Sequence, residues 1–250
     1  MTSTAQRRST GTERRGTGAG ACRLDERTWV EVDAAPPVIL VVPLGSCEQH
    51  GPHLPLHTDT VIAESLADVL IDTLAGQAGA AHMLVAPAIT VTSSGEHAGF
   101  PGTLSIGSDV TERLVVELVR SADWSNGVVL VNGHGGNAAP VRLAVAALHA
   151  EGRRVLSWWP QITDGDAHGG HSETSLMLAI APHLVHTDRA AVGRCEPVTE
   201  LYDELRRAGV RAVSPNGVLG DPTGASAEHG GELLAKLGAD LVAAVQRWQH

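Results

Sequence analysis

The sequence predicts an α/β fold with a parallel or mostly parallel sheet. Short apolar runs rich in β-branched residues alternate along the chain with longer stretches in which apolar residues recur at helical spacing. Glycine-rich polar clusters directly follow two of the apolar runs, which is where open parallel sheets carry their ligand-binding loops. A chain of 250 residues is long enough for one such domain with a sizeable core, or at most two small ones.

The chain begins with a segment of Ser, Thr, Arg and Gly. This segment lacks the apolar stretch of a secretory signal, and its composition is typical of disorder. We therefore expect residues 1–24 to form a disordered arm and residues 25–250 to form the folded domain. The first strand is predicted at residues 38–42, because an unbroken run of Val, Ile and Leu indicates burial on both faces.

The rest of the domain is expected to alternate helices and strands. A helix is predicted to begin at Thr60, because Ile62, Leu66 and Leu70 recur at helical spacing. Further strands are predicted at residues 83–86, 128–131 and 155–158. Further helices are predicted at residues 109–122, 138–150, from 172 onward, and 228–249. We find no repeat and no clear linker, so the alternation favours a single layered domain.

The composition argues against several classes of protein. A net charge of −10 argues against a nucleic-acid partner, and no apolar run approaches the length of a membrane span. The three cysteines are odd in number and far apart, which indicates a reducing, cytoplasmic setting instead of a disulfide framework. Lys236 is the only lysine, so neither a Schiff-base mechanism nor a lysine-containing phosphate loop is expected.

The most informative stretch, PLGSCEQHGPHLPLHTD at residues 43–59, follows the first predicted strand. Glu48 and His50 are two residues apart, so in an extended backbone both side chains point to the same side and can face one ion. A Pro-rich turn can then bring Asp59 back to the same place. The alternative is a polar surface loop with scattered histidines, but matching clusters elsewhere in the chain favour a site.

Two further clusters provide candidate partners for this stretch. The motif NGHGGN places His134 between glycines after the third predicted strand, on the same predicted sheet edge as Glu48. The motif DAHGGHSETS places His168 in a flexible loop and Glu173 in the first turn of a helix. We interpret Glu173 as a metal ligand and His168 as an acid/base. The alternative for Glu173 is a carboxylate that only stabilises the helix N-terminus.

Together the clusters contain three carboxylates and two imidazoles, a donor set that suits zinc, iron(II) or manganese. Two ions bridged by one carboxylate would use all five: Glu48, His50, Asp59, His134 and Glu173. Glu96 and His97, on a glycine-bearing loop, are candidates for lining a substrate pocket, with solvent exposure as the alternative. Trp158 is a candidate for contact with an aromatic substrate, with packing in the core as the alternative.

Four motifs in this order resemble the creatininase family of metal-dependent amidohydrolases. They are PLGSCEQHGPHLPLHTD, NGHGGN, HGGHSETS and GVLGDPT, and the likeness spans about residues 43–231. The resemblance implies a single three-layer α/β/α domain that forms a closed homo-oligomer, a hexamer or larger. It also implies two divalent metal ions per subunit, zinc or iron(II) with manganese as an alternative. Their ligands would be Glu48, His50, Asp59 and His134, with Asp59 bridging, and His168 would assist catalysis.

One position departs from the family pattern. Creatininase itself carries a glutamate two residues after the histidine that corresponds to His134, and here that position is Gly136. The departure weakens the case for creatinine as the substrate and leaves one ligand missing at the second metal. We expect Glu173 to be the replacement.

Residues 94–97 with Phe100, together with residues 165–175 and 213–223, resemble a branch of intracellular peptidases within this family. That resemblance implies that metal-activated water hydrolyses a modified precursor peptide and releases its C-terminal Val–Tyr-derived dipeptide unit during maturation of a redox cofactor. Two alternatives remain open. One is an amidohydrolase or formamide deformylase acting on a small cyclic amide or formamide, and the other is a non-catalytic metal-binding protein.

Overall fold

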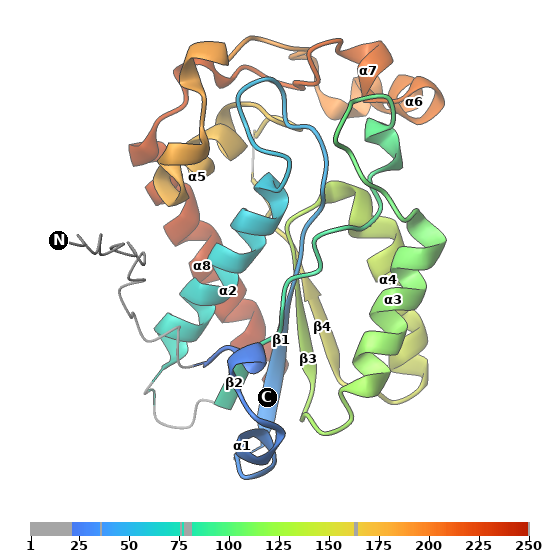
Figure 1. The fold of residues 1–250 in the computed structure, drawn as a ribbon, viewed down its shortest axis with the longest axis vertical. Helices are drawn as coiled ribbons and strands as arrows, with labels where there is room; N and C mark the ends of the chain where they lie inside the picture. The colour runs from blue at the N-terminus through green and yellow to red at the C-terminus, as the bar shows by residue number, and fades with distance from the viewer. Residues whose placement is uncertain (1–21, 36, 76, 78–81, 163–164, 250) are drawn as a thin grey trace, which may run out of the picture.

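The structure, a computed structural model, describes residues 22–35, 37–75, 77, 82–162 and 165–249. Within these residues, four parallel strands form one sheet in the order β2-β1-β3-β4 (Figure 1). The strands are β1 (Val38–Leu44), β2 (His82–Val85), β3 (Val128–Asn132) and β4 (Val155–Trp158). The predicted parallel sheet is therefore confirmed.

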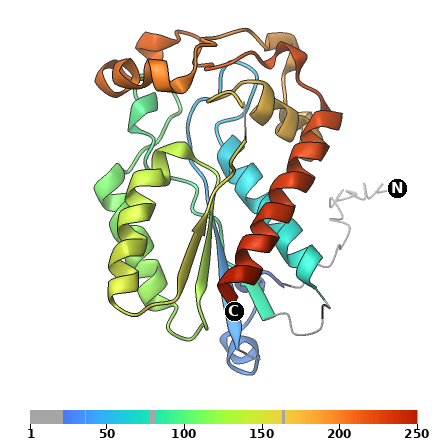
Figure 2. The same ribbon diagram turned by 180° about the vertical axis from the view of Figure 1, so that it is seen from behind.

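Helices cover both faces of the sheet, which gives the three α/β/α layers that the family resemblance implied (Figures 1 and 2). One face is covered by α2 (Thr58–Leu74), α5 (His171–Ile180) and α8 (Ala227–Gln249). The other face is covered by α3 (Ser108–Ser121) and α4 (Ala138–Ala150). The described residues contain no helix long and apolar enough to cross a membrane.

Alternate residues of each strand divide the core into two halves. In β1, Ile39 and Val41 pack with α2, α5 and α8, while Leu40 and Val42 pack with α3 and α4. This alternation follows from the pleat of a strand that is buried on both faces. Every residue of β1 is buried, so the loop that follows this strand starts from a rigid platform.

The observed boundaries lie within two residues of the predicted ones, but three described α-helices were not predicted. They are α1 (Trp29–Asp33), α6 (Val198–Ala208) and α7 (Val210–Val213). The start of α1 is a capping box formed by Thr28 and Glu31, a signal that is visible in the sequence. With only four residues, α7 is too short to produce a periodic pattern.

The expected N-terminal arm is described only at its end, since residues 1–21 lie outside the described residues. Arg23, which falls within the expected arm, forms a parallel bridge with Val85 at the edge of the sheet. Its guanidinium also pairs with Asp68 of α2 at 2.7 Å. This part of the chain therefore packs on the folded domain.

The strand order produces a topological switch point between β1 and β3. The chain leaves β1 for β2 on one side and then crosses to β3 on the other side of β1. The loops that follow β1 and β3 therefore diverge at the carboxyl edge of the sheet, where open α/β sheets bind ligands. Helices α6 and α7 lie over this end of the molecule (Figure 1).

Candidate metal centre

The loop after β1 carries two of the candidate ligands into the interior. Glu48 and His50 are both 0% exposed, and Asp59, in the first turn of α2, is 2% exposed. Potential ligand atoms of these three residues lie within 4.8 Å of one another. The structure therefore brings together the three side chains that the first motif was expected to join.

His134 reaches the same place from the loop after β3. It directly precedes a short 3-10 helix (Gly135–Asn137) and is buried. A Cβ atom on Gly133 would lie 2.4 Å from the carbonyl oxygen of Asp59, so only glycine lets this loop come so close to the start of α2. The close approach sets the His134 ring against Asp59.

Asp59 lies between two histidines. Its Oδ1 atom is 2.9 Å from His50 Nε2, and its Oδ2 atom is 3.0 Å from His134 Nδ1. The Ser46 hydroxyl donates a hydrogen bond to Oδ2 at 2.7 Å. His50 Nδ1–H donates to the Glu48 carbonyl oxygen at 3.1 Å, which leaves Nε2 to face Asp59. One carboxylate thus faces two imidazoles with separate oxygen atoms, as a ligand that bridges two ions does.

Glu173 joins the cluster from the first turn of α5. Its Oε2 atom lies 4.0 Å from His50 Nε2, and ligand atoms of His50, His168 and Glu173 lie within 4.8 Å of one another. A different residue holds the start of the helix: the carboxylate of Asp166 accepts hydrogen bonds from the backbone N–H groups of His171 and Ser172. Glu173 Oε2 also accepts a hydrogen bond from the Gly169 N–H at 2.6 Å, so Glu173 stabilises the start of the helix as well as facing the cluster.

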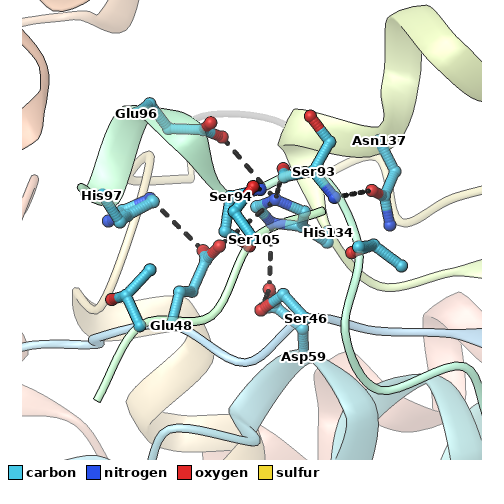
Figure 3. Close-up of polar contacts among 12 residues, drawn as sticks. Ser46, Glu48, Asp59, Ser93, Ser94, Glu96, His97, Ser105, His134 and Asn137 are labelled. Carbon is cyan, nitrogen blue, oxygen red and sulfur yellow. Dashed lines mark hydrogen bonds and ion pairs between the residues drawn. The ribbon is translucent and has the colours of Figure 1, made fainter. Parts of the chain in front are cut away.

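Glu96 and His97 come from a 3-10 helix, η3 (Gly95–His97), and their side chains point into the same cluster (Figure 3). Glu96 Oε1 lies 3.6 Å from His134 Nε2, and His97 Nε2 lies 3.3 Å from Glu48 Oε1. Both residues also line a cavity. The sequence indicated a role in substrate binding for them, and the structure places them among the candidate metal ligands as well.

The electrostatics of this cluster fit a cation. Burial raises the pKa of Glu48 to about 8, and neither of its carboxylate oxygens accepts a hydrogen bond from the described residues. Burial alone would lower the pKa of His134, but Glu48 and Asp59 raise it to about 10. A buried carboxylate without donors is destabilising, and a divalent ion among these oxygens and nitrogens would relieve that cost. The residues present therefore fit a metal centre.

His168 is neutral and fixed in place. Its burial is the main reason that its pKa lies well below the usual range. Nε2–H donates to the Gln49 carbonyl oxygen at 2.7 Å, so the unprotonated Nδ1 is the nitrogen that lies 3.8 Å from Glu48 Oε1. The backbone of His168 forms an antiparallel bridge with Leu219. The histidine is therefore held by pairing, whereas the sequence had indicated a flexible loop.

Asn137, which the sequence analysis did not single out, joins three loops around the centre. Its Nδ2 group donates hydrogen bonds to the Gly45 carbonyl oxygen and to Asn132 Oδ1, each at 3.1 Å. Its Oδ1 atom accepts one from the Ser93 N–H at 3.3 Å. Asn137 closes the NGHGGN motif, so its position beside a ligand histidine was a usable signal.

Gln49, between two candidate ligands in the sequence, was also not singled out. Its buried side-chain amide donates to the Gly217 carbonyl oxygen at 3.0 Å and lies 2.8 Å from His97 Nδ1. Because the amide nitrogen can only donate, His97 Nδ1 is the acceptor and Nε2 carries the proton, 3.3 Å from Glu48 Oε1 but without the geometry of a hydrogen bond. Gln49 therefore sets the orientation and the protonation of the His97 ring.

Two cavities adjoin the cluster. The larger, of about 420 Å³, has apolar walls that include Ile62, Trp159 and Leu176. The smaller, of about 190 Å³, is lined by Glu48, Asp59, Glu96, His97 and His168 among others. His134 and Glu173 line both cavities. The larger volume falls within the usual range for sites that bind small molecules.

Trp158 is absent from the described residues that line these two cavities. The residue is 8% exposed and its side chain packs in the core, and Nε1–H donates to Asp240 Oδ2 of α8 at 2.8 Å. This placement corrects the expectation that Trp158 contacts the substrate. Successive residues at a strand end point in opposite directions, so the neighbouring Trp159 lines the larger cavity instead.

Comparison with known proteins identifies relatives across nearly the whole domain. The creatininase family, described as creatinine amidohydrolase, matches residues 25–245. The chain is 46% identical over 213 residues to the mycofactocin precursor peptide peptidase of Mycolicibacterium smegmatis, covering 84% of this chain and 85% of the relative. It is 30% identical over 243 residues to the creatinine amidohydrolase of Pseudomonas putida, covering 84% and 90%.

Solved structures agree with these relatives. A creatininase mutant of Zn-Zn type superposes with a TM-score of 0.74 at 25% identity, covering 90% of this chain and 97% of that chain. A manganese creatininase superposes with a TM-score of 0.69 at 25% identity, covering 91% and 98%. The four ordered motifs, the parallel three-layer fold and the matched length all agree, and the chain belongs to the creatininase family.

Proposed function

We propose that this chain is the peptidase of mycofactocin biosynthesis, which hydrolyses the modified precursor peptide and releases its C-terminal Val–Tyr-derived dipeptide unit. As a member of the creatininase family, the chain is a metal-dependent hydrolase that acts on C–N bonds, and its 46% identity to a mycofactocin precursor peptide peptidase supports this substrate. The observation that carries the proposal is the position of Asp59, whose two carboxylate oxygens face His50 and His134 beside a cavity of about 420 Å³.

The clustered side chains would hold two divalent ions, zinc, iron(II) or manganese. Glu48 and His134 would hold one, and His50 and Glu173 the other, with Asp59 shared. When bound, such ions lower the pKa of water to about 7 and polarise the scissile carbonyl group. The names of two solved relatives, a Zn-Zn creatininase and a manganese creatininase, support this choice of metals.

His168 acts as the acid/base of the reaction. Its unprotonated Nδ1 accepts the proton that water loses as the water oxygen bonds to the scissile carbonyl carbon. The same Nδ1–H then donates to the leaving nitrogen as the C–N bond breaks, which returns the ring to its starting state. Gln49 keeps Nδ1 in position, because its carbonyl oxygen accepts the hydrogen bond from Nε2–H at 2.7 Å.

The larger cavity is where the C-terminal unit of the peptide would bind. Ile62, Trp159 and Leu176 offer apolar and aromatic surface, which suits side chains derived from valine and tyrosine. Glu173 lies on the wall of the same cavity. The scissile bond would therefore lie next to the candidate ligands when the dipeptide unit fills the cavity.

A small cyclic amide or a formamide is the second candidate substrate class, because the chain is 30% identical to a creatinine amidohydrolase. The test is to incubate the metal-loaded protein with the modified precursor peptide, with creatinine and with a formamide, and to identify products by mass. We expect release of the dipeptide unit, and a chelated sample serves as the control. Turnover of a small amide alone would support the second class, and no turnover by fully loaded protein would support a non-catalytic role.

We also propose that the chain forms a cytoplasmic homo-oligomer of six or more subunits. All three cysteines, Cys22, Cys47 and Cys195, are free, which suits a reducing compartment. The assembly is proposed from the family to which the chain belongs. Light scattering at micromolar concentration is expected to give the mass of six or more subunits, and a monomer would refute the proposal.

A further inference from the structure

The carboxylate of the half-buried Glu96 lies at the edge of the cluster, on the side of His134. Its Oε1 atom is 3.6 Å from His134 Nε2, and ligand atoms of Glu48, Glu96 and His134 lie within 4.8 Å of one another (Figure 3). Both carboxylate oxygens of Glu48 are buried and accept no hydrogen bond from the described residues. Two carboxylates and one imidazole thus converge at a place where the buried carboxylate of Glu48 has no hydrogen-bond donor.

Gly136 explains how Glu96 can lie so close to His134. A Cβ atom at position 136 would lie 2.2 Å from Glu96 Oε1 and 2.5 Å from the Ser93 carbonyl oxygen, too close for any side chain. The absence of a side chain at position 136 therefore leaves room for a carboxylate that comes from a different loop. Sequence reasoning treated Gly136 as a missing ligand, and the structure places Glu96 in the space that such a ligand would use.

We propose that Glu96 is a metal ligand, and that it supplies beside His134 the carboxylate that position 136 lacks. The assignment rests on the metal-dependent function proposed above. Glu173, the replacement expected from the sequence, lies instead 4.0 Å from His50 and serves the other ion. The carboxylates around the two ions are then Glu48, Asp59, Glu96 and Glu173. Their four negative charges match the four positive charges of two divalent cations.

Hydrogen bonds on both sides of Glu96 hold its backbone. The Ser93 N–H donates to Asn137 Oδ1 at 3.3 Å, and the Ser94 N–H donates to the Ser105 hydroxyl at 2.9 Å (Figure 3). Beyond η3, the Arg211 guanidinium of α7 donates to the Gly99 carbonyl oxygen. The segment is therefore fixed before metal binds, and the Glu96 carboxylate is delivered to a defined place.

The test compares Glu96→Gln, which keeps the shape of the side chain, with Glu117→Gln, a matched change on the exposed surface of α3. Each metal-free protein is titrated with Mn²⁺, and bound metal is measured by mass spectrometry and by the spin coupling of paired Mn²⁺ ions. We expect wild type and Glu117→Gln to bind two coupled ions. We expect Glu96→Gln to bind one of them with a Kd raised about 10²-fold or more, because losing a group that only supports a ligand already costs about 10–100-fold.

Two results would overturn the assignment, and they differ in what else they overturn. If wild type and Glu96→Gln bind two ions with equal affinity while the variant turns over peptide more slowly, Glu96 binds substrate and only this assignment fails. If wild type binds neither Mn²⁺, Zn²⁺ nor Fe²⁺, the proposed function fails with it. Equal unfolding curves for the metal-free proteins are the check that Glu96→Gln is folded.

Discussion

The candidate metal centre has two halves that share Asp59 and are built from different kinds of structure. The first half contains His50 and Glu173, and the second contains Glu48, Glu96 and His134. In the first half, Asp59 and Glu173 lie in the first turns of α2 and α5, where the helix dipole favours a negative charge. In the second half, every ligand comes from a loop or a 3-10 helix. The first half thus takes both of its carboxylates from helices packed in the core and only His50 from the loop after β1, whereas the second, apart from Asp59, depends on loops joined by hydrogen bonds.

The largest expected effect comes from Asp59→Ala, because Asp59 belongs to both halves. Its two oxygens face His50 and His134, so the change should remove more bound metal than any other single substitution. Peptide turnover should fall by more than the roughly 10²–10⁴-fold expected for loss of an acid/base. Metal analysis of the purified variant checks this prediction. Full occupancy would show that the halves are independent and that Asp59 does not bridge.

His168→Ala should separate chemistry from metal binding in both halves. The variant should keep its metal content and its oligomeric state but lower kcat by roughly 10²–10⁴-fold, the usual range for a positioned acid/base. His183→Ala, on an exposed 3-10 helix, is the matched control and should leave kcat unchanged. If His168→Ala instead loses one ion, His168 is a metal ligand, and the ion that is lost identifies its half, since the ring lies near His50 and Glu173 and also near Glu48.

Glu173→Ala tests the first half by itself. It should weaken one ion by about 10²-fold or more and leave the ion beside His134 in place, because Glu173 lies near His50. Combined with Glu96→Gln, it should remove both ions, since the two residues belong to different halves. Titration of the single and double variants with Mn²⁺ checks this. Loss of the same ion in both single variants would mean that the division into halves is wrong.

Whether a feature depends on neighbouring residues or on distant ones explains which parts of the fold could be predicted from the sequence. The strands and the helices that cover the sheet were predicted, because unbroken β-branched runs and helical stripes depend only on neighbouring residues. Helix α6 was missed even though Leu201 and Leu205 are four residues apart and Gly209 follows its end. That pattern was readable, whereas the four residues of α7 carry no periodic signal.

Within the site, five candidate ligands were recognised because each lies in a motif that follows a strand or begins a helix. The proximity of Glu96 to His134 could not be predicted in this way. It depends on Gly136, forty positions further along the chain, because this residue has no side chain to fill the space that the Glu96 carboxylate uses. The direction of Trp158 was equally hidden, because adjacent residues at a strand end face opposite sides and the sequence does not say which side is the cavity.

The smallest expected effect comes from Asn137→Ala, which tests whether the second half depends on its loops. The change removes the acceptor of the buried Ser93 N–H, while the Gly45 carbonyl keeps the Thr92 hydroxyl and Asn132 Oδ1 keeps the His134 N–H as donors. The loss should destabilise the metal-free protein by about 1–3 kcal/mol. The ion beside His134 should bind about 10-fold more weakly, while the ion beside Glu173 keeps its affinity, because Asp59 and Glu173 lie in helices α2 and α5, to which Asn137 makes no hydrogen bond.

Urea unfolding of the metal-free protein and Mn²⁺ titration measure these two effects of Asn137→Ala, and Asn126→Ala, an exposed asparagine before β3, is the matched control. Asn137→Asp sharpens the result. It keeps an acceptor for the Ser93 N–H and removes the two donors, so it separates the hydrogen bond that holds the Glu96 segment from those that join the loops after β1 and β3. Equal weakening of both ions in Asn137→Ala would mean that the helix-borne half also depends on the loops, and that the two halves form one unit.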